Sequence, residues 1–584
     1  MTIQNKKTKS DTVRYLTKPR SEPCSTTGVI QLVKFLANRN IKNSEDFLKL
    51  KQNAAAQLKM PLPDNVSILE IYQKLLKKRK IKKNRFFEKL KKRPVRSLSG
   101  IAVISVLTKP FKCPGQCLFC PSEKNLPKSY VSGEPAVERA KYFKFDPYLQ
   151  VKKRIETLEK LGHPTDKIEL IVIGGSWSVL PKRYQTWFIK ECFRGANEKK
   201  SESESKSKKT LRKLEEGLTR EQKRNEKTKH RIIGLTLETR PDLITPPEIL
   251  MMRKLGATRI EIGVQILNDK ILNLNNRGHS LKEIVEATLL LREAGFKICY
   301  HLMFGLPFSS FKKDVECFKK VFADSRFRPD MLKLYPCVVI KGSKLFKLWQ
   351  KKKYIPCSNK ILINLLTKTK LMVPPYVRIN RVIRDIPATK IEAGSKISNL
   401  RETVLKELKK RGLSCQCIRC KEIKNETDLR GFKLVKREYE SSRGKEIFLS
   451  FENQPRRQRV GAPIPTNMSG SPDVRRGSEA SETKNKLVAF LRLRLQNNFP
   501  KYFKELKNAA LIREVHTYGE LTPIGGRKDA AQHQGFGKKL INEAEKIAEK
   551  NGFKKMAVIS GIGAREYYRK LGYRLMNTYM IKSI

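Results

Sequence analysis

Two hydrophobic periods alternate between residue 100 and about residue 384. Short β-branched runs predict strands at 101–107, 168–173, 232–237, 259–264 and 297–302. Helical spacing of apolar residues predicts amphipathic helices over 147–161 and 281–294. Because strands that alternate with helices form parallel sheets with helical crossovers, we expect an α/β domain built as a partial (β/α) barrel.

The last part of the chain, about 431–584, has a second pattern. Strands are predicted at 446–451, 487–495, 510–518 and 555–560, and a helix over 537–550. Residues 453–486, rich in Pro, Gly, Ser and Arg, are expected to be a disordered surface insertion, and the charged segment 199–230 a second surface insertion. This part therefore reads as a smaller α/β domain.

Residues 1–95 are polar and basic and predict a helix over 68–92. Phe86 and Phe87 interrupt its charges and are expected to act as apolar anchors beside cations that bind phosphate; a solvated helix face is the alternative. The predicted division is a basic helical N-terminal region (1–95), a barrel domain (96–390), a cysteine-containing linker (391–430) and the second α/β domain (431–584).

Charge points to a polyanionic partner. The chain has 124 Lys and Arg against 57 Asp and Glu in 584 residues, a net charge of +67. Nucleic acid is the commonest macromolecular counter-charge, with a generally lysine-biased composition as the alternative. No apolar run approaches the roughly 18 residues of a membrane span, and the cysteines cluster as metal ligands do in a reducing compartment. We expect a cytoplasmic protein that binds RNA and no membrane.

Cys113, Cys117 and Cys120 follow the first predicted strand with C-x₃-C-x₂-C spacing. Three thiolates can hold three irons of a 4Fe-4S cluster and leave the fourth open to S-adenosylmethionine (SAM). Phe119, before the last cysteine, is an aromatic residue of the type usual in the radical SAM family. A zinc knuckle lacking its fourth ligand, or free thiols, are the alternatives. The combined pattern favours the cluster.

Further candidates lie where later strands end. Gly174 and Gly175 would let bare backbone approach a cofactor amine, and Glu238, Arg240 and Glu261 place charges on or after parallel strands. A tight turn and surface charges are the alternatives. Their occurrence downstream of the cysteines favours a site.

A glycine-rich turn, Gln532-His-Gln-Gly535-Phe536-Gly537, precedes the helix of the second domain. Consecutive backbone N–H groups there can bind a pyrophosphate at a helix N-terminus. The Q-x-x-G-x-G form resembles that of GNAT-type acetyltransferases, which bind acetyl-CoA. Tyr567 is interpreted as a ligand contact by this resemblance; packing is the alternative.

With both signatures in one chain, the sequence resembles the Elongator catalytic-subunit family of tRNA carboxymethyluridine synthases. The likeness runs from about residue 107 to the C-terminus outside the two insertions. Its most specific stretches are 128–130, 133–135, 139–140, 146–150, 161–163, 238–242, 276–279, 332–336, 381–387, 513–519, 532–537 and 559–563.

The resemblance implies a reaction. A deoxyadenosyl radical would take hydrogen from the acetyl methyl of acetyl-CoA, the carbon radical would add to carbon-5 of a wobble uridine, and thioester hydrolysis would leave a carboxymethyl group. Glu238, Arg240 and Tyr567 become catalytic candidates. The acetyl-CoA contacts carried over are Lys167, Glu514, Val515, His516, Thr517, Gly535, Phe536, Gly537 and Tyr567. An ordinary surface lysine is the alternative for Lys167. tRNA, an electron-donor protein and Elongator-like accessory subunits are the implied partners.

Two departures from the family pattern matter. The first two cysteines are closer together than usual, and Cys120-Pro-Ser-Glu123 replaces a Gly-Gly, which leaves the geometry of this loop open. Cys415, Cys417 and Cys420 form a second thiol group suited to structural zinc with a distant fourth ligand, or are free thiols. Competing functions are a protein-lysine acetyltransferase with a structural iron-sulfur domain and a non-catalytic RNA-binding scaffold.

Overall fold

The computed structural model describes residues 26–41, 43–82, 84, 86–87, 100–197, 210–423, 429–453, 485–519 and 535–584. The chain divides into two compact units. The first comprises residues 1–94 and 157–163, and the second residues 95–156 and 164–584. Among the described residues, no helix combines the length and apolarity that crossing a bilayer requires.

The first unit packs three amphipathic helices, α1 (Thr26–Ala37), α2 (Ser44–Gln57) and α3 (Asn65–Lys77). The side chain of Asp64 accepts hydrogen bonds from the backbone N–H groups of Val66 and Ser67 and so caps α3. The apolar faces share one core. The N-terminal region is therefore helical as predicted.

Two details predicted for this region are wrong. The helix predicted over 68–92 ends at Lys77, because Arg79 adopts a left-handed backbone (φ +55°). Phe86 and Phe87 are 4% and 1% exposed and pack on the ring of Phe47, with Phe87 also stacked on Tyr72 at 4.1 Å. These rings complete the core, so they are not RNA anchors. Residues 88–92 of the predicted helix lie outside the described residues.

The second unit begins with a seven-stranded, fully parallel sheet in the order β1-β2-β3-β4-β5-β6-β8. Its strands are β1 (Ala102–Leu107), β2 (Lys167–Ile173), β3 (Arg231–Thr239), β4 (Arg259–Gln265), β5 (Lys297–Phe304), β6 (Met331–Pro336) and β8 (Arg378–Arg381). β1 and β8 are its edge strands and do not pair with each other, so the barrel is open and the sheet forms a half-barrel. The five strands predicted here are confirmed; β6 and β8 were not predicted.

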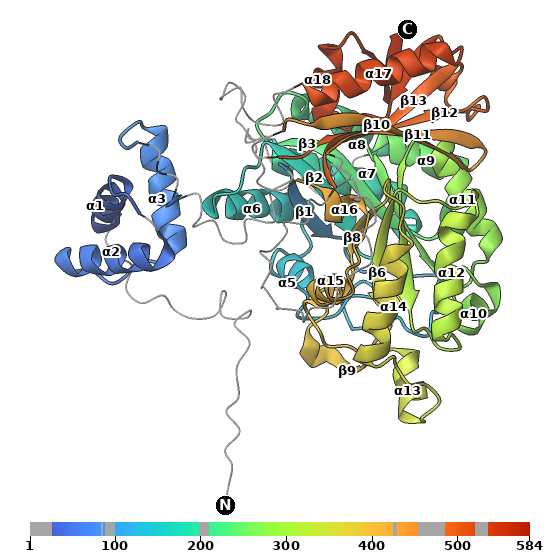
Figure 1. The fold of residues 1–584 in the computed structure, drawn as a ribbon, viewed down its shortest axis with the longest axis horizontal. Helices are drawn as coiled ribbons and strands as arrows, with labels where there is room; N and C mark the ends of the chain where they lie inside the picture. The colour runs from blue at the N-terminus through green and yellow to red at the C-terminus, as the bar shows by residue number, and fades with distance from the viewer. Residues whose placement is uncertain are drawn as a thin grey trace, which may run out of the picture. The chain divides into compact units, whose positions relative to one another are not determined.

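Most of the helices of this part lie between successive strands in the chain, and Figure 1 shows α11, α12 and α14 beside the sheet. They are α5 (Pro135–Tyr142), α6 (Pro147–Lys160), α7 (Lys182–Ala196), α8 (Leu211–Asn225), α9 (Pro246–Lys254), α10 (Asp269–Leu274), α11 (Leu281–Glu293), α12 (Phe311–Ala323), α13 (Lys344–Gln350), α14 (Asn359–Leu371) and α15 (Leu400–Lys410). A short pair, β7 (Val339–Ile340) and β9 (Ile391–Ala393), is antiparallel.

α8 belongs to the segment 199–230 that the sequence assigns to a surface insertion. Its face with Leu214 and Leu218 is buried. Asn225 accepts a hydrogen bond from the backbone N–H of Ile232 at 2.7 Å, and Glu226 pairs with Arg565 at 3.0 Å. This half of the segment is therefore part of the packed fold, while residues 198–209 lie outside the described residues.

A second seven-stranded sheet has the order β10-β11-β12-β13-β14-β16-β15. Its elements are β10 (Phe432–Ser441), β11 (Gly444–Asn453), β12 (Lys486–Leu495), β13 (Ala509–Thr517), β14 (Lys555–Val558), β15 (Arg574–Met576), β16 (Tyr579–Ser583), α17 (Phe536–Lys550) and α18 (Arg565–Arg569). Figure 1 shows α17 on the face of this sheet away from the half-barrel. The predicted strands and α17 are confirmed within a few residues.

Buried ion pairs join the two sheets. Asp330, at the start of β6, accepts hydrogen bonds from Arg292 of α11 at 2.8 Å and from Arg513 of β13 at 2.5 and 3.0 Å. Arg513 also donates to Glu446 of β11 at 3.0 Å. All four side chains are 0–1% exposed. β13 is thus held on the half-barrel by charges that water cannot reach.

Candidate functional site

The cysteine loop leaves β1 at the carboxyl edge of the parallel sheet. Cys117 is buried, and Arg277 donates to its Sγ at 3.4 Å. A hydrogen bond from Cys120 and the positive charge of Arg277 lower the pKa of Cys117 to about 5. Lys128 donates to the carbonyl of Gly115 at 2.6 Å and closes the loop. The loop therefore offers one thiolate, that of Cys117, beside the positive charge of Arg277, whereas its hydrogen bond to Cys117 and burial raise the pKa of Cys120 well above its ordinary value.

Arg240 lies against this loop with one donor unused. Its other nitrogens bind Asp242 at 2.9 Å and the carbonyl of Gly278 at 3.0 Å. Its Nη1 is buried with no partner among the described residues, and a Cβ placed on Gly115 would lie 2.4 Å from it. A buried unpaired guanidinium N–H is costly unless an anionic group completes it. The loop and Arg240 fit a cluster with a carboxylate-bearing ligand.

The glycine pair lies in a turn at the end of β2, as the sequence placed it, and its approach to a cofactor stays a prediction. Gly174 and Gly175 have φ of +136° and +92°, a backbone that side chains disfavour. A Cβ on Gly174 would lie 2.1 Å from Thr108 Oγ1, which is buried and has no hydrogen-bond partner in the described ranges. β1 and β2 therefore meet in close backbone contact beside the cysteine loop.

A chain of buried polar groups crosses the interior of the half-barrel. Tyr130 donates to Glu238 at 3.1 Å, Lys333 donates to Glu238 at 3.2 Å and contacts Glu261, and Glu261 binds His301 at 2.8 Å. Burial alone would raise the pKa of Glu261, but Lys333 and His301 outweigh it and hold the pKa well below its ordinary value. The structure thus links Glu238 to Glu261.

Sequence reasoning did not assign roles to Tyr130, Lys333 and His301. Tyr130 and Lys333 lie in stretches that resemble the family, and a lysine between apolar residues of a buried strand is the signal that could have found Lys333. Arg277, which donates to Cys117, also lies in a stretch that resembles the family, and sequence reasoning gave it no role either.

The acetyl-CoA candidates converge at the N-terminus of α17. Gly535 caps the helix with a left-handed backbone (φ +74°), and a Cβ placed on it would meet no described residue within 4 Å. A Cβ on Gly537 would lie 3.1 Å from Tyr567 Oη, 3.8 Å from Thr517 Oγ1 and 4.0 Å from Val515 Cγ1. Four predicted contacts from α17, β13 and α18 therefore surround one helix N-terminus. Gln532, His533 and Gln534 of the motif lie outside the described residues.

The remaining candidates contribute differently. Phe536 is buried against Phe451 at 4.8 Å, so only its backbone faces a ligand. Glu514 accepts from Arg492 at 2.9 Å. His516 stacks on Phe490 at 5.8 Å, and burial lowers its pKa to about 4, which keeps the imidazole neutral near pH 7.

Lys167 opens β2 beside Arg231 of β3. Gly563, in the short helix η7 (Ile562–Ala564), packs there, since its Cβ would lie 2.6 Å from that of Arg231. Lys167 is therefore close to the second domain but at the amino end of β2. The cysteine loop lies at the carboxyl end, about 20 Å away along a strand of this length.

Cys415, Cys417 and Cys420 are brought together as predicted. Their sulfur atoms lie within 4.8 Å of one another. Lys370 Nζ lies 3.8 Å from Cys420 Sγ, and among the described residues no His, Cys, Asp or Glu joins the group as a fourth ligand. The donor set fits a metal held by three thiolates, and zinc stays a prediction.

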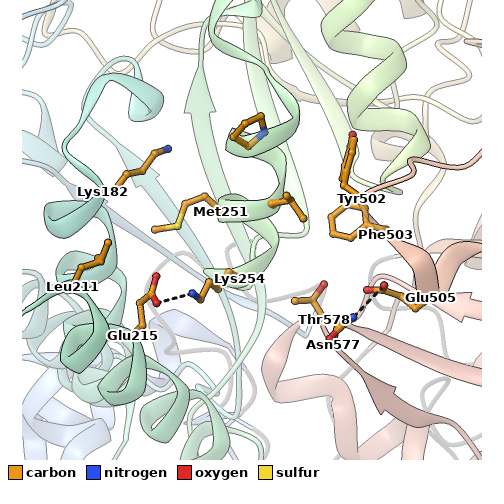
Figure 2. A pocket seen from close by; sticks show the side chains of 12 residues that line it. Lys182, Leu211, Glu215, Met251, Lys254, Tyr502, Phe503, Glu505, Asn577 and Thr578 are labelled. Carbon is orange, nitrogen blue, oxygen red and sulfur yellow. Dashed lines mark hydrogen bonds and ion pairs between the residues drawn. The ribbon is translucent and has the colours of Figure 1, made fainter.

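One cavity lies away from all of these residues. Figure 2 shows it between α7, α8 and α9 on one side and the segments around Phe503 and Asn577 on the other, with a volume of about 470 Å³. Tyr502, Glu505 and Thr578 carry oxygen atoms without partners among the described residues, but these atoms have almost no accessible surface. These three oxygen atoms are therefore not available to a ligand in the cavity.

Comparison with known families agrees with the two halves of the site. The model of the radical SAM superfamily matches residues 109–318, that of the Radical_SAM C-terminal domain residues 329–410, and that of the acetyltransferase (GNAT) family residues 471–573. The fold and the site thus define a radical SAM protein with a GNAT acetyltransferase domain. Membership of the radical SAM family implies a 4Fe-4S cluster and SAM, and membership of the GNAT family implies acetyl-CoA.

The relatives narrow this class. The tRNA uridine(34) acetyltransferase of Methanocaldococcus infernus is 44% identical over 85% of this chain and 88% of its own length, and the Elongator complex protein 3 of Homo sapiens is 36% identical over 85% and 86%. The chain belongs to the Elongator complex protein 3 family. The solved structure of the archaeal M. infernus Elp3 with an N-terminal deletion has a TM-score of 0.67 at 40% identity, covering 83% of this chain and all of that one.

Proposed function

We propose that the protein places a carboxymethyl group on carbon-5 of the wobble uridine of tRNA, using SAM radical chemistry and acetyl-CoA. Relatives named tRNA uridine(34) acetyltransferase support the substrate, and the +67 charge supports a nucleic-acid partner. The main support is that one compact unit contains both candidate sites. The first is the three-cysteine loop beside Arg240, whose Nη1 has no partner among the described residues, and the second is the glycine turn beside Tyr567.

On the half-barrel side, Cys113, Cys117 and Cys120 would hold the cluster. When bound, the cluster and SAM supply the radical that takes a hydrogen from the acetyl methyl group. Arg240 Nη1 would bind a carboxylate of the bound SAM, because that donor faces the loop unpaired. Glu238, fixed by Tyr130 and Lys333, presents a charged acceptor to the cofactor.

On the GNAT side, the backbone N–H groups that follow Gly535 would hold the pyrophosphate of acetyl-CoA at the positive end of α17. Tyr567 is 43% exposed and reaches the same turn, so its hydroxyl can bind the ligand. Lys167 lies toward this domain. The acetyl group would therefore have to cover the length of a strand, from the amino end of the sheet near Lys167 to the cysteine loop at its carboxyl end.

Other parts of the proposal concern partners. The basic residues 1–95 would supply tRNA affinity through phosphate contacts, and Cys415, Cys417 and Cys420 would bind zinc in a structural role. An electron-donor protein and Elongator-like accessory subunits would complete the cytoplasmic system.

The test is mass spectrometry of nucleosides from tRNA incubated anaerobically with the reconstituted protein, reductant, SAM and acetyl-CoA. Carboxymethyluridine is expected with the wild type and not when SAM or acetyl-CoA is omitted. Acetylated lysine in a protein, formed without modified uridine, would favour the lysine acetyltransferase instead.

A further inference from the structure

A cluster of tilted aromatic rings reaches the surface immediately before the cysteine loop. The ring of Phe111 lies 4.9 Å from that of Tyr184, which lies 5.5 Å from Trp187 and 5.7 Å from the buried Phe188. Phe111 is 36% exposed, so the cluster runs from the buried Phe188 of α7 to a ring at the surface. We call Phe111, Tyr184 and Trp187 the aromatic platform.

The backbone beneath the platform is held in place. Lys109 donates its N–H to Tyr184 Oη at 3.0 Å, and Pro110 fixes the next φ angle. Thr108 N–H bonds the carbonyl of Ile173, which ties the start of the segment to β2. The backbone that leads to Phe111 is therefore held in place, and its ring rests on that of Tyr184, which reduces the ordering entropy that binding on the ring would cost.

Cations surround the platform. Lys109, Lys112 and Arg183 are exposed, and none of them forms an ion pair with another described residue. Lys182 is different, because it pairs with Glu248. Exposed rings between unpaired cations form the surface that binds single-stranded nucleic acid, where bases stack and phosphates pair.

We propose that Phe111 stacks a nucleotide of the tRNA anticodon loop next to the uridine that is modified. This rests on the proposed function and adds to it the surface that holds the RNA. Phe111 is two residues from Cys113, at most about 7 Å between Cα atoms. A uridine must leave its stack to reach buried chemistry, and a ring beside the entrance replaces the stacking that its neighbour loses.

The experiment uses the full-length protein and an anticodon stem-loop with 2-aminopurine beside the wobble uridine. Stacking on the ring quenches this base. Phe111→Leu keeps apolar volume but removes the π face, so affinity should fall about 5- to 100-fold with loss of quenching. Phe111→Tyr should keep both. The slope of affinity against salt should stay unchanged in Phe111→Leu and should flatten in Lys112→Gln.

Phe308→Leu is the matched control. Phe308 is 51% exposed, and its four nearest neighbours in sequence include no cation. It should bind and quench as the wild type does. Unchanged binding and quenching in Phe111→Leu, or an equal loss in Phe308→Leu, would overturn the inference. So would a Phe111→Leu protein that binds RNA normally but no longer binds an accessory protein.

The result separates the inference from the proposed function. A wild type that binds the stem-loop without quenching overturns the role of Phe111 alone. A wild type that binds neither the stem-loop nor whole tRNA overturns both.

Discussion

Gly535 and Gly552 share a backbone conformation and differ in their place on α17. Both have positive φ (+74° and +80°), and within the part of the chain that the structure describes a Cβ on either meets nothing within 4 Å. A Glu at either position costs similar strain, on the order of 1 kcal/mol. Only Gly535 lies at the helix N-terminus, where a carboxylate would repel the pyrophosphate. Gly535→Glu should abolish acetyl-CoA binding by calorimetry, while Gly552→Glu should bind as the wild type does. Equal binding by both variants would place acetyl-CoA elsewhere.

Cys117 and Cys192 offer a similar comparison for the cluster. Both are buried, but Cys192 lies in the core of α7, where burial raises its pKa well above the ordinary value. Cys117→Ala should remove the iron and the reductive cleavage of SAM, because two thiolates cannot hold the cluster. Cys192→Ala should retain both. Iron analysis and the yield of 5′-deoxyadenosine measure the outcome, and an active Cys117→Ala protein would contradict the assignment.

At this scale the sequence suggested candidate ligand residues but not the side chains that hold such residues in place. Cysteines and glycines are recognisable by spacing, because the chemistry limits which residue types can serve. Lys333 and His301 could not be found in this way. Their role depends on contacts with Glu238 and Glu261 across the interior of the half-barrel, from strands that are far apart in the chain.

Among the elements, β13 connects the two domains through Arg513. Burial alone would raise the pKa of Asp330, but Arg292 and Arg513 outweigh it and hold that pKa well below its ordinary value. Asp330→Asn leaves these arginines without their counter-charge, so the free energy of unfolding should fall by about 3–5 kcal/mol. Asp324→Asn, which breaks a surface pair with Arg326, should change it little. Denaturant titration measures both.

The same carboxylate predicts a pH dependence. A depressed pKa contributes stability above the unfolded value, about 3.9, and that stability is lost as pH falls through the folded pKa. The wild type should therefore lose stability below about pH 4, and Asp330→Asn should lose less over the same range. Parallel curves for the two proteins would show that Asp330 does not stay ionised in the fold.

Strands and helices were predicted where periodicity is strong, and the exceptions have physical causes. β10 was missed because most of its residues are partly or fully exposed, and β15 because it has only three residues, all exposed. α8 was assigned to an insertion because most of its residues are charged or polar, and the few apolar residues that it buries are therefore not conspicuous in the sequence. The helix over 68–92 was predicted too long because the composition of this segment favours a helix throughout and gives no sign that the backbone of Arg79 is left-handed.

For the molecule as a whole, we predict that the basic N-terminal region, residues 1–95, supplies much of the affinity for tRNA. Removal of residues 1–95 should weaken tRNA binding and reduce the slope of log K against log salt, since fewer phosphates are neutralised. Filter binding at several salt concentrations measures the slope. An unchanged slope would move the main RNA contacts to the second unit.

The central claim is that acetyl-CoA held by the GNAT domain supplies carbon to a uridine modified by the half-barrel. The most direct measurement is anaerobic turnover with acetyl-CoA carrying ¹³C at both acetyl carbons, followed by mass spectrometry of the tRNA nucleosides. The account predicts carboxymethyluridine that carries both labels from the wild type and none from Gly535→Glu, although cleavage of SAM persists in that variant. Unlabelled carboxymethyluridine, or a normal yield from Gly535→Glu, would contradict it.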